Sequence, residues 1–267
     1  MTPFPQNVVH DLLGHPEHLA SAATRVDRVE ELAEYLNVLS SELIPTMLVP
    51  DDNRPGHVRL GDFVFRCDQV RQTPVRLAFD MLRNDNLPYH RLVWVVRALH
   101  KDPDTGAPLE DRCAFCLAHF AWSAAVALAR CHGCGGEADR MPAKSIVPGD
   151  AKADFCAQLL SSSVRRRSDF RRTLPDGMAT WPEADLLEMA DALGDLGPST
   201  AGPSAALNAL YLGQAAMVTH VAGRLREMRR EAPRISGLVA FANLTVRINR
   251  LRSHRVRGRL ALVLEAL

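Results

Sequence analysis

Apolar residues recur at intervals of three and four along much of the chain, which is the spacing of amphipathic helices. The first clear helix is predicted over about 22–39, where Val29, Leu32, Leu36 and Leu39 share one side. The same reasoning predicts further helices over 74–86, 87–100, 151–160, 182–193 and 205–231, and a helical region over 235–267 with a break at Gly258. The uncharged, alanine-rich stretch 113–129 is interpreted as a buried core helix.

Extended structure is indicated only over residues 60–67, and a strand alone in a helical protein would lack a pairing partner. Aromatic residues make up 6% of the chain, and alanine and leucine are abundant, which favours helices filled with small and aliphatic side chains. The sequence therefore predicts an all-α protein.

A length of 267 residues is enough for two domains. Serines followed by an arginine run and Pro175-Asp176-Gly177 are typical of a linker, which we place at 163–177. The prediction is an N-terminal domain over 1–162 and a smaller, basic helical C-terminal domain over 178–267.

Charge is divided unequally between these parts. Residues 1–162 carry 16 basic and 21 acidic side chains, whereas residues 163–267 carry 16 basic and 10 acidic ones. The acidic end of one copy would attract the basic end of the next, so we expect head-to-tail self-association that salt weakens.

The C-terminal half is rich in arginine, whose planar guanidinium binds phosphate with two hydrogen bonds, although GC-rich coding would also enrich arginine. Residues 224–259 contain 11 arginines against two glutamates, which indicates a cationic surface for nucleic acid, anionic lipid or an acidic protein. The candidate phosphate-binding residues are Arg165, Arg166, Arg167, Arg224, Arg229, Arg247, Arg250, Arg252, Arg255 and Arg257.

Two Cys-x-x-Cys pairs, Cys113/Cys116 and Cys131/Cys134, have the outline of a four-cysteine zinc site. A helix over the 14 residues between them would be about 21 Å long and would hold the pairs apart. We therefore expect buried free cysteines and no metal, with Cys131 and Cys134 as the weaker zinc candidates.

Motifs of enzyme chemistry are absent from the sequence: it contains no phosphate-binding glycine loop, nucleophile elbow or His-Glu-x-x-His. We expect a protein that is not an enzyme and needs no cofactor. The 17 uncharged residues of 113–129 are shorter than a membrane span of about 20, and the N-terminus lacks signal-peptide features, so any membrane contact is expected to be peripheral.

Several short motifs together resemble one family. They are Leu60-Gly61-Asp62-Phe63-Val64-Phe65, Phe79-Asp80-Met81-Leu82, Ser123-Ala124-Ala125-Val126-Ala127-Leu128, Phe155-Cys156-Ala157-Gln158, and Leu212-Gly213-Gln214-Ala215-Ala216-Met217-Val218 with Met228 and Pro233. Their order over about residues 30–250 resembles that of orthomyxovirus matrix proteins, nearer the tick-borne thogotoviruses than influenza.

The resemblance implies an N-terminal domain of two four-helix subdomains and a structural layer beneath the virion envelope that acts in assembly and budding. It implies contacts with anionic membrane, viral ribonucleoprotein or RNA, the viral nuclear export protein and glycoprotein tails, and presence in the host cytoplasm, inner plasma membrane and nucleus. The candidate lipid- or phosphate-binding residues are Arg71, Arg76, Arg91, Arg97 and Lys101, and the C-terminal arginines named above are the candidates for binding ribonucleoprotein.

Two alternatives stay open. The first is a nucleic-acid-binding regulator that uses the C-terminal arginines, with or without zinc at Cys131 and Cys134. The second is an antagonist of host signalling, a role that extended relatives of the matrix family can take.

Overall fold

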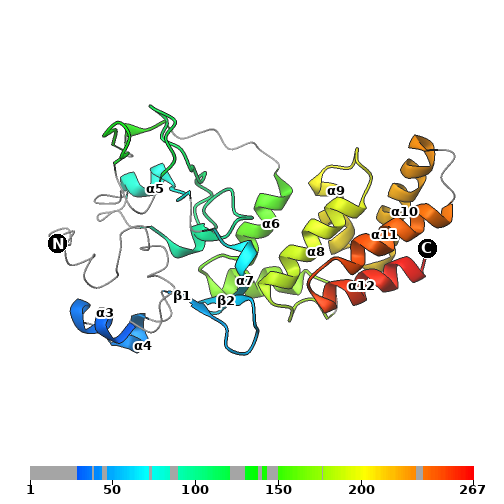
Figure 1. Ribbon diagram of the computed structural model, residues 1–267, viewed down its shortest axis with the longest axis horizontal. Helices are drawn as coiled ribbons and strands as arrows, with labels where there is room; N and C mark the ends of the chain where they lie inside the picture. The colour runs from blue at the N-terminus through cyan, green and yellow to red at the C-terminus, as the bar shows by residue number, and fades with distance from the viewer. Residues whose placement is uncertain are drawn as a thin grey trace. The chain divides into compact units, whose positions relative to one another are not determined.

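The computed structural model describes residues 29–267 apart from positions 38, 44–46, 72–73, 85–89, 121–129, 138–139, 143–149, 176 and 233–236. The chain divides into two compact units, unit 1 over Met1–Ile146 and unit 2 over Val147–Leu267. Figure 1 shows the short helices and strands of unit 1 and the longer helices of unit 2.

Unit 1 combines a small antiparallel sheet with short helical segments. Its elements are α3 (Val29–Leu36), α4 (Ser40–Leu43), β1 (Leu48–Pro50), β2 (His57–Leu60), β3 (Phe63–Arg66), the 3-10 turn η4 (Cys67–Gln69), α5 (Phe79–Asn84) and the 3-10 turn η5 (Leu92–Val95). Among the described residues of this unit the α-helices are short, and the two expected four-helix subdomains are not confirmed.

The sheet has the strand order β1-β2-β3, with β2 paired antiparallel to both neighbours. Gly61 and Asp62 form a two-residue turn between the paired Leu60 and Phe63, and Gly61 has a φ of 55°, which glycine adopts without strain. The turn interrupts the extended run predicted over 60–67. Leu60 belongs to β2, and Phe63–Arg66 form β3. The all-α prediction is thus right about the predominance of helix and wrong about the sheet.

The core of unit 1 unites residues from helix, loop and turn. Val75, Leu77, Ala78, Phe79, Leu82, Trp94, Cys113, Phe120, Cys131 and Met141 form one buried cluster. The rings of Phe79 and Phe120 meet edge to face, with centroids 5.8 Å apart. Two cysteines, Cys113 and Cys131, belong to this cluster, so the geometry around them affects the packing of the whole unit.

Arg76 is a structural residue of this unit. Only 4% of it is exposed, and its guanidinium donates hydrogen bonds to the backbone carbonyls of Trp94, Val96 and Leu99. Burial first, and then the nearby charge of Arg71, lower the pKa of Arg76 to about 9, so it stays protonated at neutral pH. The expectation that Arg76 contacts lipid is wrong, because its charged end holds the 94–99 backbone.

The other members of the predicted lipid stripe lie nearer the surface. Arg71 pairs with Asp111 at 3.6 Å, and Arg97 donates from Nε to the carbonyl of Val70 at 3.0 Å. Arg91 lies over the ring of Trp94, 5.3 Å from its centroid. Lys101 lies in an antiparallel bridge with Pro108.

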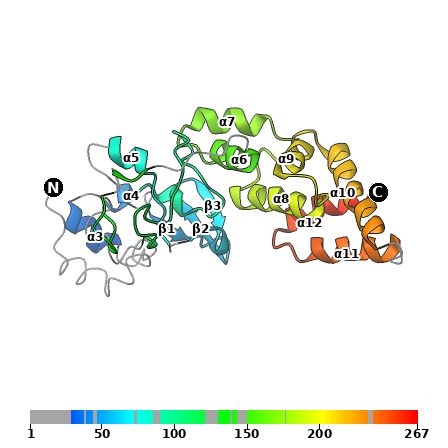
Figure 2. The same cartoon turned by 90° about the horizontal axis from the view of Figure 1, so that it is seen from above.

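Unit 2 is a helical bundle (Figure 2). Its helices are α6 (Ala151–Leu159), α7 (Val164–Arg172), α8 (Glu183–Leu196), α9 (Pro203–Tyr211), α10 (Gln214–Glu231), α11 (Gly237–Asn249) and α12 (His254–Glu265). Helix α8 packs against α6, α9, α10 and α12, and it is buried along most of its length. The carboxylate of Glu188 on α8 accepts hydrogen bonds from the backbone N–H groups of Arg252 and Ser253, both at 2.8 Å, and so satisfies two donors at the start of α12.

The sequence predicts the positions of the helices of unit 2 more accurately than their boundaries. The predicted helix 205–231 is two helices, because Leu212-Gly213 separates them and Gly213 has a φ of 86°. The helical region predicted over 235–267 is divided before Ser253, which caps the start of α12, and not at Gly258, which lies within α12.

The predicted linker 163–177 contains a helix instead of a flexible connection. Ser163 caps α7 with its side chain, and Phe170 is buried against Phe155 of α6 with ring centroids 5.4 Å apart. Arg171 donates to the carbonyls of Ala179 and Trp181, both at 2.8 Å. The division between the units therefore falls at 146/147, before α6 and not after it.

Replacing Arg76 with glutamine should destabilise unit 1 by about 3 kcal/mol, since three buried carbonyls would lose a charged donor. Chemical denaturation followed by tryptophan fluorescence measures this change. The matched control is Arg59→Gln, because Arg59 is exposed on β2 and its loss should cost less than about 0.5 kcal/mol. Equal stability of the two variants would contradict the structural role of Arg76.

Candidate metal centre

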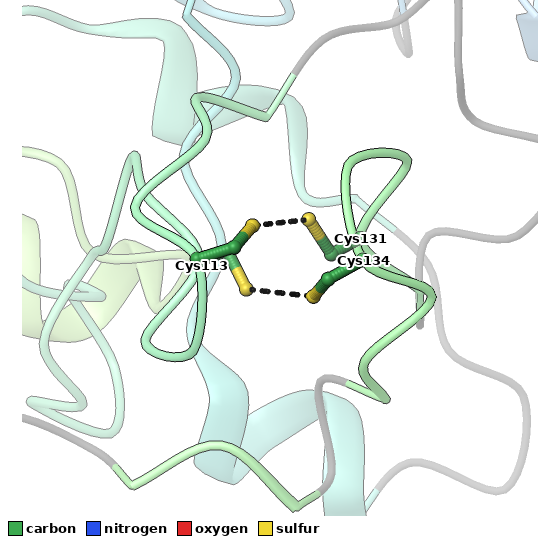
Figure 3. Close-up of side chains that lie close together, drawn as sticks. Cys113, Cys131 and Cys134 are labelled. Carbon is green, nitrogen blue, oxygen red and sulfur yellow. Dashed lines mark hydrogen bonds between the residues drawn. The ribbon is translucent and has the colours of Figure 1, made fainter.

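Four cysteine sulfurs of unit 1 lie together. The Sγ atoms of Cys113, Cys116, Cys131 and Cys134 are all within 4.8 Å of one another. Two of the separations are 3.7 Å, between Cys113 and Cys134, and 3.6 Å, between Cys116 and Cys131. Figure 3 shows the side chains of Cys113, Cys131 and Cys134 pointing toward one another from two separate turns. All four are free thiols.

The first pair of cysteines lies on a tight turn over residues 113–118. The N–H of Cys113 donates to the carbonyl of Ala118 at 2.9 Å, and the N–H of Leu117 donates back to the carbonyl of Cys113 at 3.0 Å. The N–H of Phe115 donates to Cys113 Sγ at 3.4 Å. Both thiols of the turn are thereby presented on one side of the backbone.

The second pair lies on a turn with the same hydrogen bonds. The N–H of Cys131 donates to the carbonyl of Gly136, and the N–H of Gly135 donates to the carbonyl of Cys131, both at 2.8 Å. The N–H of Gly133 donates to Cys131 Sγ at 3.3 Å. In each turn the fifth residue, Leu117 or Gly135, has a positive φ, of 63° or 71°.

The two turns pack directly on each other, and two glycines make this possible. A Cβ added at Gly136 would lie 2.6 Å from the ring carbon Cδ2 of Phe115. A Cβ added at Gly133 would lie 3.1 Å from Ala118 Cβ and 3.3 Å from Cys116 Sγ. The close approach of the backbones brings the four sulfurs within reach of one ion.

A third copy of the turn precedes the cysteine turns and holds no cysteine. In residues 102–107 the N–H of Asp102 donates to the carbonyl of Ala107, the N–H of Gly106 donates to the carbonyl of Asp102, and Gly106 has a φ of 74°. Antiparallel bridges flank all three turns in the same way, at Lys101↔Pro108, Arg112↔His119 and Arg130↔Glu137. The structure thus contains a short internal repeat that is not evident in the sequence.

In the turn over 102–107 the first residue is Asp102, whose carboxylate takes the place of the cysteine sulfur of the other two turns. Asp102 Oδ1 accepts from the N–H groups of Asp104 and Thr105 at 3.1 and 2.9 Å, and Asp102 Oδ2 accepts from Trp94 Nε1 at 2.8 Å. This carboxylate is satisfied by protein donors alone, so the turn needs no ion to hold it closed.

The geometry of the cysteine cluster fits a tetrahedral metal ion. Zinc–sulfur bonds are about 2.3 Å long, so the edge of a regular tetrahedron of four sulfurs is about 3.8 Å. The two separations of 3.6 and 3.7 Å agree with that edge. Tetrahedral sites with four sulfurs are typical of zinc or iron. The N–H groups directed at Cys113 and Cys131 are donors that stabilise thiolates.

The thiols influence one another's ionisation. Burial opposes ionisation of Cys131, but the N–H groups of Cys134 and Gly133 and two neighbouring thiols outweigh it and lower the pKa of Cys131 to about 7. At Cys116 the N–H of Ala118 favours the thiolate, but desolvation and three neighbouring thiols raise its pKa to about 12. Four sulfurs this close do not all ionise by themselves, and a cation would offset their mutual repulsion.

The expectation that a helix separates the two pairs is wrong for the part of the chain that the structure describes. Residues 113–120 form a turn and a bridge, and Arg130 pairs with Glu137 in another bridge; residues 121–129 lie outside the described residues. The cluster adds Cys113 and Cys116 to the two predicted zinc candidates. The signal that could have found them is the matched Cys-x-x-Cys spacing of the two pairs, which is typical of a four-cysteine zinc site.

The predicted phosphate-binding arginines of unit 2 fall into two groups. Arg165, Arg166, Arg229, Arg247, Arg250, Arg252 and Arg255 are exposed. Arg167 and Arg257 are half-buried and donate to backbone carbonyls. Arg167 donates to the carbonyl of Ser161 at 2.6 Å, and Arg257 donates to the carbonyl of Leu251 at 2.5 Å. Arg224 is half-buried and pairs with Glu227. The first group is exposed and is therefore the set that a phosphate could reach from solvent, although Arg247 also donates to the carbonyl of Asp195 at 3.2 Å and Arg255 pairs with Asp185.

Comparison with known proteins gives no relative: no family model, curated protein or solved structure matches the chain. None of the helices within the described residues is long and apolar enough to cross a bilayer.

Replacing Cys116 with serine should remove zinc from the purified chain and lower the unfolding temperature of unit 1 by more than about 10 °C, because metal binding and folding are coupled. Elemental analysis and thermal unfolding measure both effects. Cys67→Ser is the control, since Cys67 is also exposed but lies on η4 outside the cluster. Identical metal content in the two variants would rule out the site.

Proposed function

We propose that the chain is a zinc-containing nucleic-acid-binding protein without enzymatic activity. The observation that carries the proposal is the four-cysteine cluster on two matched turns. Paired cysteine turns around zinc are small structural devices that recur in nucleic-acid-binding modules. The ion would hold unit 1 together, and the arginines of unit 2 would supply affinity for phosphate.

The exposed arginines of unit 2 support the second half of this proposal. Helices α10, α11 and α12 pack against one another. Arg226, Arg229 and Arg230 lie near the end of α10, whereas Arg247 and Arg250 lie at the opposite end of α11. Helix α11 has 13 residues and is therefore about 20 Å long. A nucleic-acid backbone that runs along α11 carries several phosphates within the length of this helix. Basic groups at the two ends of α11 therefore fit such a backbone.

Unit 2 carries the charge that such binding needs. Residues 147–267 contain 17 basic and 12 acidic side chains, against 15 and 19 in residues 1–146. Several acidic residues of unit 2 are engaged: Asp185 pairs with Arg255 at 3.4 Å, and Glu227 pairs with Arg224. The exposed arginines of α10 and α11 would then dominate the local potential.

A second candidate is the envelope-lining matrix protein that the sequence motifs suggest. The observation that favours it is the outer side of α11, where Leu238, Val239, Phe241 and Val246 are exposed, Leu238 by 81%. Arg247 and Arg250 adjoin this apolar side. An apolar strip beside basic residues suits the surface of an anionic membrane. The motif Ser123–Leu128, which contributes to the resemblance, lies outside the described residues.

Charge reversal at Arg247 and Arg250 together should weaken binding to a 20-nucleotide single-stranded RNA by about tenfold or more at 100 mM salt. The slope of log affinity against log salt should also become shallower, by about 0.7 for each phosphate that the variant no longer neutralises. Fluorescence anisotropy over a salt series measures both. Arg54→Glu, an exposed change in unit 1, is the control. If the intact chain binds neither RNA nor DNA at low salt, the proposed function is wrong.

Co-sedimentation with vesicles separates the second candidate from the first. A matrix protein should bind phosphatidylserine vesicles in preference to neutral ones, and Leu238→Ser with Phe241→Ser should abolish the binding while leaving RNA affinity unchanged. Leu212→Ser, an exposed apolar position between α9 and α10, is the matched control. Equal sedimentation of the intact chain with and without vesicles would exclude the membrane role.

A further inference from the structure

The first cysteine turn exposes two apolar side chains next to the cluster. Phe115 is 55% exposed and Leu117 is 67% exposed. Both lie on the short loop that contains Cys116, so they are fixed by the same hydrogen bonds that shape the turn. Two large apolar groups on one rigid tip are unusual unless another molecule covers them.

Comparison with the two sister turns shows that the turn itself does not require them. The fifth residue is Gly106 in the turn over 102–107 and Gly135 in the turn over 131–136, and both have a positive φ. Leu117 adopts a φ of 63° there, a region that leucine enters only with strain. At the third position the sister turns have Asp104 and Gly133 in place of Phe115. Strained backbone that also exposes an apolar side chain points to a role outside the fold.

The ring of Phe115 is held in place from one side. Gly136 of the opposite turn approaches the edge of this ring so closely that a Cβ there would lie 2.6 Å from Cδ2. The ring is thus positioned by the packing of the two turns, while more than half of the residue remains accessible. A preorganised aromatic ring with an open face is the element on which an unpaired base stacks.

Basic residues flank the bases of the two cysteine turns. Arg112 directly precedes Cys113, and His119 lies opposite it in the bridge. On the other turn Arg130 and Arg140 both pair with Glu137, at 3.0 Å each, so a single carboxylate serves two guanidiniums. The nearby acid Asp111 is paired with Arg71. The bridges and ion pairs at the bases of the two turns therefore carry more basic than acidic side chains.

We propose that Phe115 and Leu117 form a stacking platform for an unpaired base of single-stranded nucleic acid, with Arg112, Arg130 and Arg140 next to its phosphates. This inference rests on the proposed function and adds a second contact site to it, on unit 1. A stacked base meets apolar surface on its flat face and leaves its phosphate at the edge, which matches an apolar tip with basic residues at the bases of the turns. Duplex would not bind here, because its bases are already stacked and paired.

The variants Phe115→Ala and Leu117→Gly test the platform in the full, zinc-loaded chain. Each should weaken binding to a 20-nucleotide single-stranded RNA, and to the matching single-stranded DNA, by about tenfold, and should leave duplex binding unchanged. Leu117→Gly is the informative one, because glycine suits the backbone at this position. It should keep its zinc and fold at least as well as the original chain while its affinity falls. Leu39→Ala, an exposed leucine in unit 1, is the matched control.

A second readout identifies the bound surface directly. Irradiation of the complex with RNA containing 5-bromouridine should cross-link Phe115 or its immediate neighbours, as mapped by mass spectrometry. If the intact chain binds single strands but Phe115→Ala and Leu117→Gly bind equally well and the cross-links map only to unit 2, the platform is refuted and the proposed function stands. Absence of binding by the intact chain at low salt refutes both.

Discussion

The mutual approach of four sulfurs is the constraint on which unit 1 depends. Cys113 and Cys131 are part of its buried cluster, yet the segments that carry them are joined to the rest by isolated bridges and turn hydrogen bonds. Such segments have little intrinsic stability, because each ordered residue costs conformational entropy and few long ladders offset it. Four thiols held together would also oppose one another's ionisation. One tetrahedral ion bound by the four sulfurs would offset both effects, since it would cross-link the turns and neutralise the thiolates.

The repeated turn accommodates two kinds of side chain at its first position, a carboxylate in one copy and a thiol in the other two. Each copy directs backbone N–H groups toward the side chain of its first residue. At Asp102 that side chain is a carboxylate, and protein donors such as Trp94 Nε1 complete its hydrogen bonding. At Cys113 and Cys131 it is a thiol in a pair of facing turns, which leaves room for an ion between them. The same backbone thus supports a carboxylate without a metal in one copy and would supply a pair of metal ligands in each of the other two.

The sequence predicts unit 2 much better than unit 1, for physical reasons. Helices such as α8 and α10 depend on local periodicity, which a single sequence records. The sheet of unit 1 depends on pairing between distant short segments, and local preference alone does not separate the turn at Gly61-Asp62 from the interior of one strand. The predicted separation of the two cysteine pairs assumes a helix between them. The length of such a helix is calculated correctly, but residues 113–120 do not form a helix. Arg76 illustrates a different limit, because a sequence does not distinguish a surface arginine from one that supports buried carbonyls.

Zinc K-edge X-ray absorption of the purified full-length chain tests the central claim most directly, because it reports the atoms bound to the ion without any assumption about the fold. The account predicts four sulfur scatterers at about 2.3 Å and no shell of lighter atoms. A first shell of nitrogen or oxygen at about 2.0 Å, or a folded chain that contains no zinc and takes up none when it is added, would contradict it.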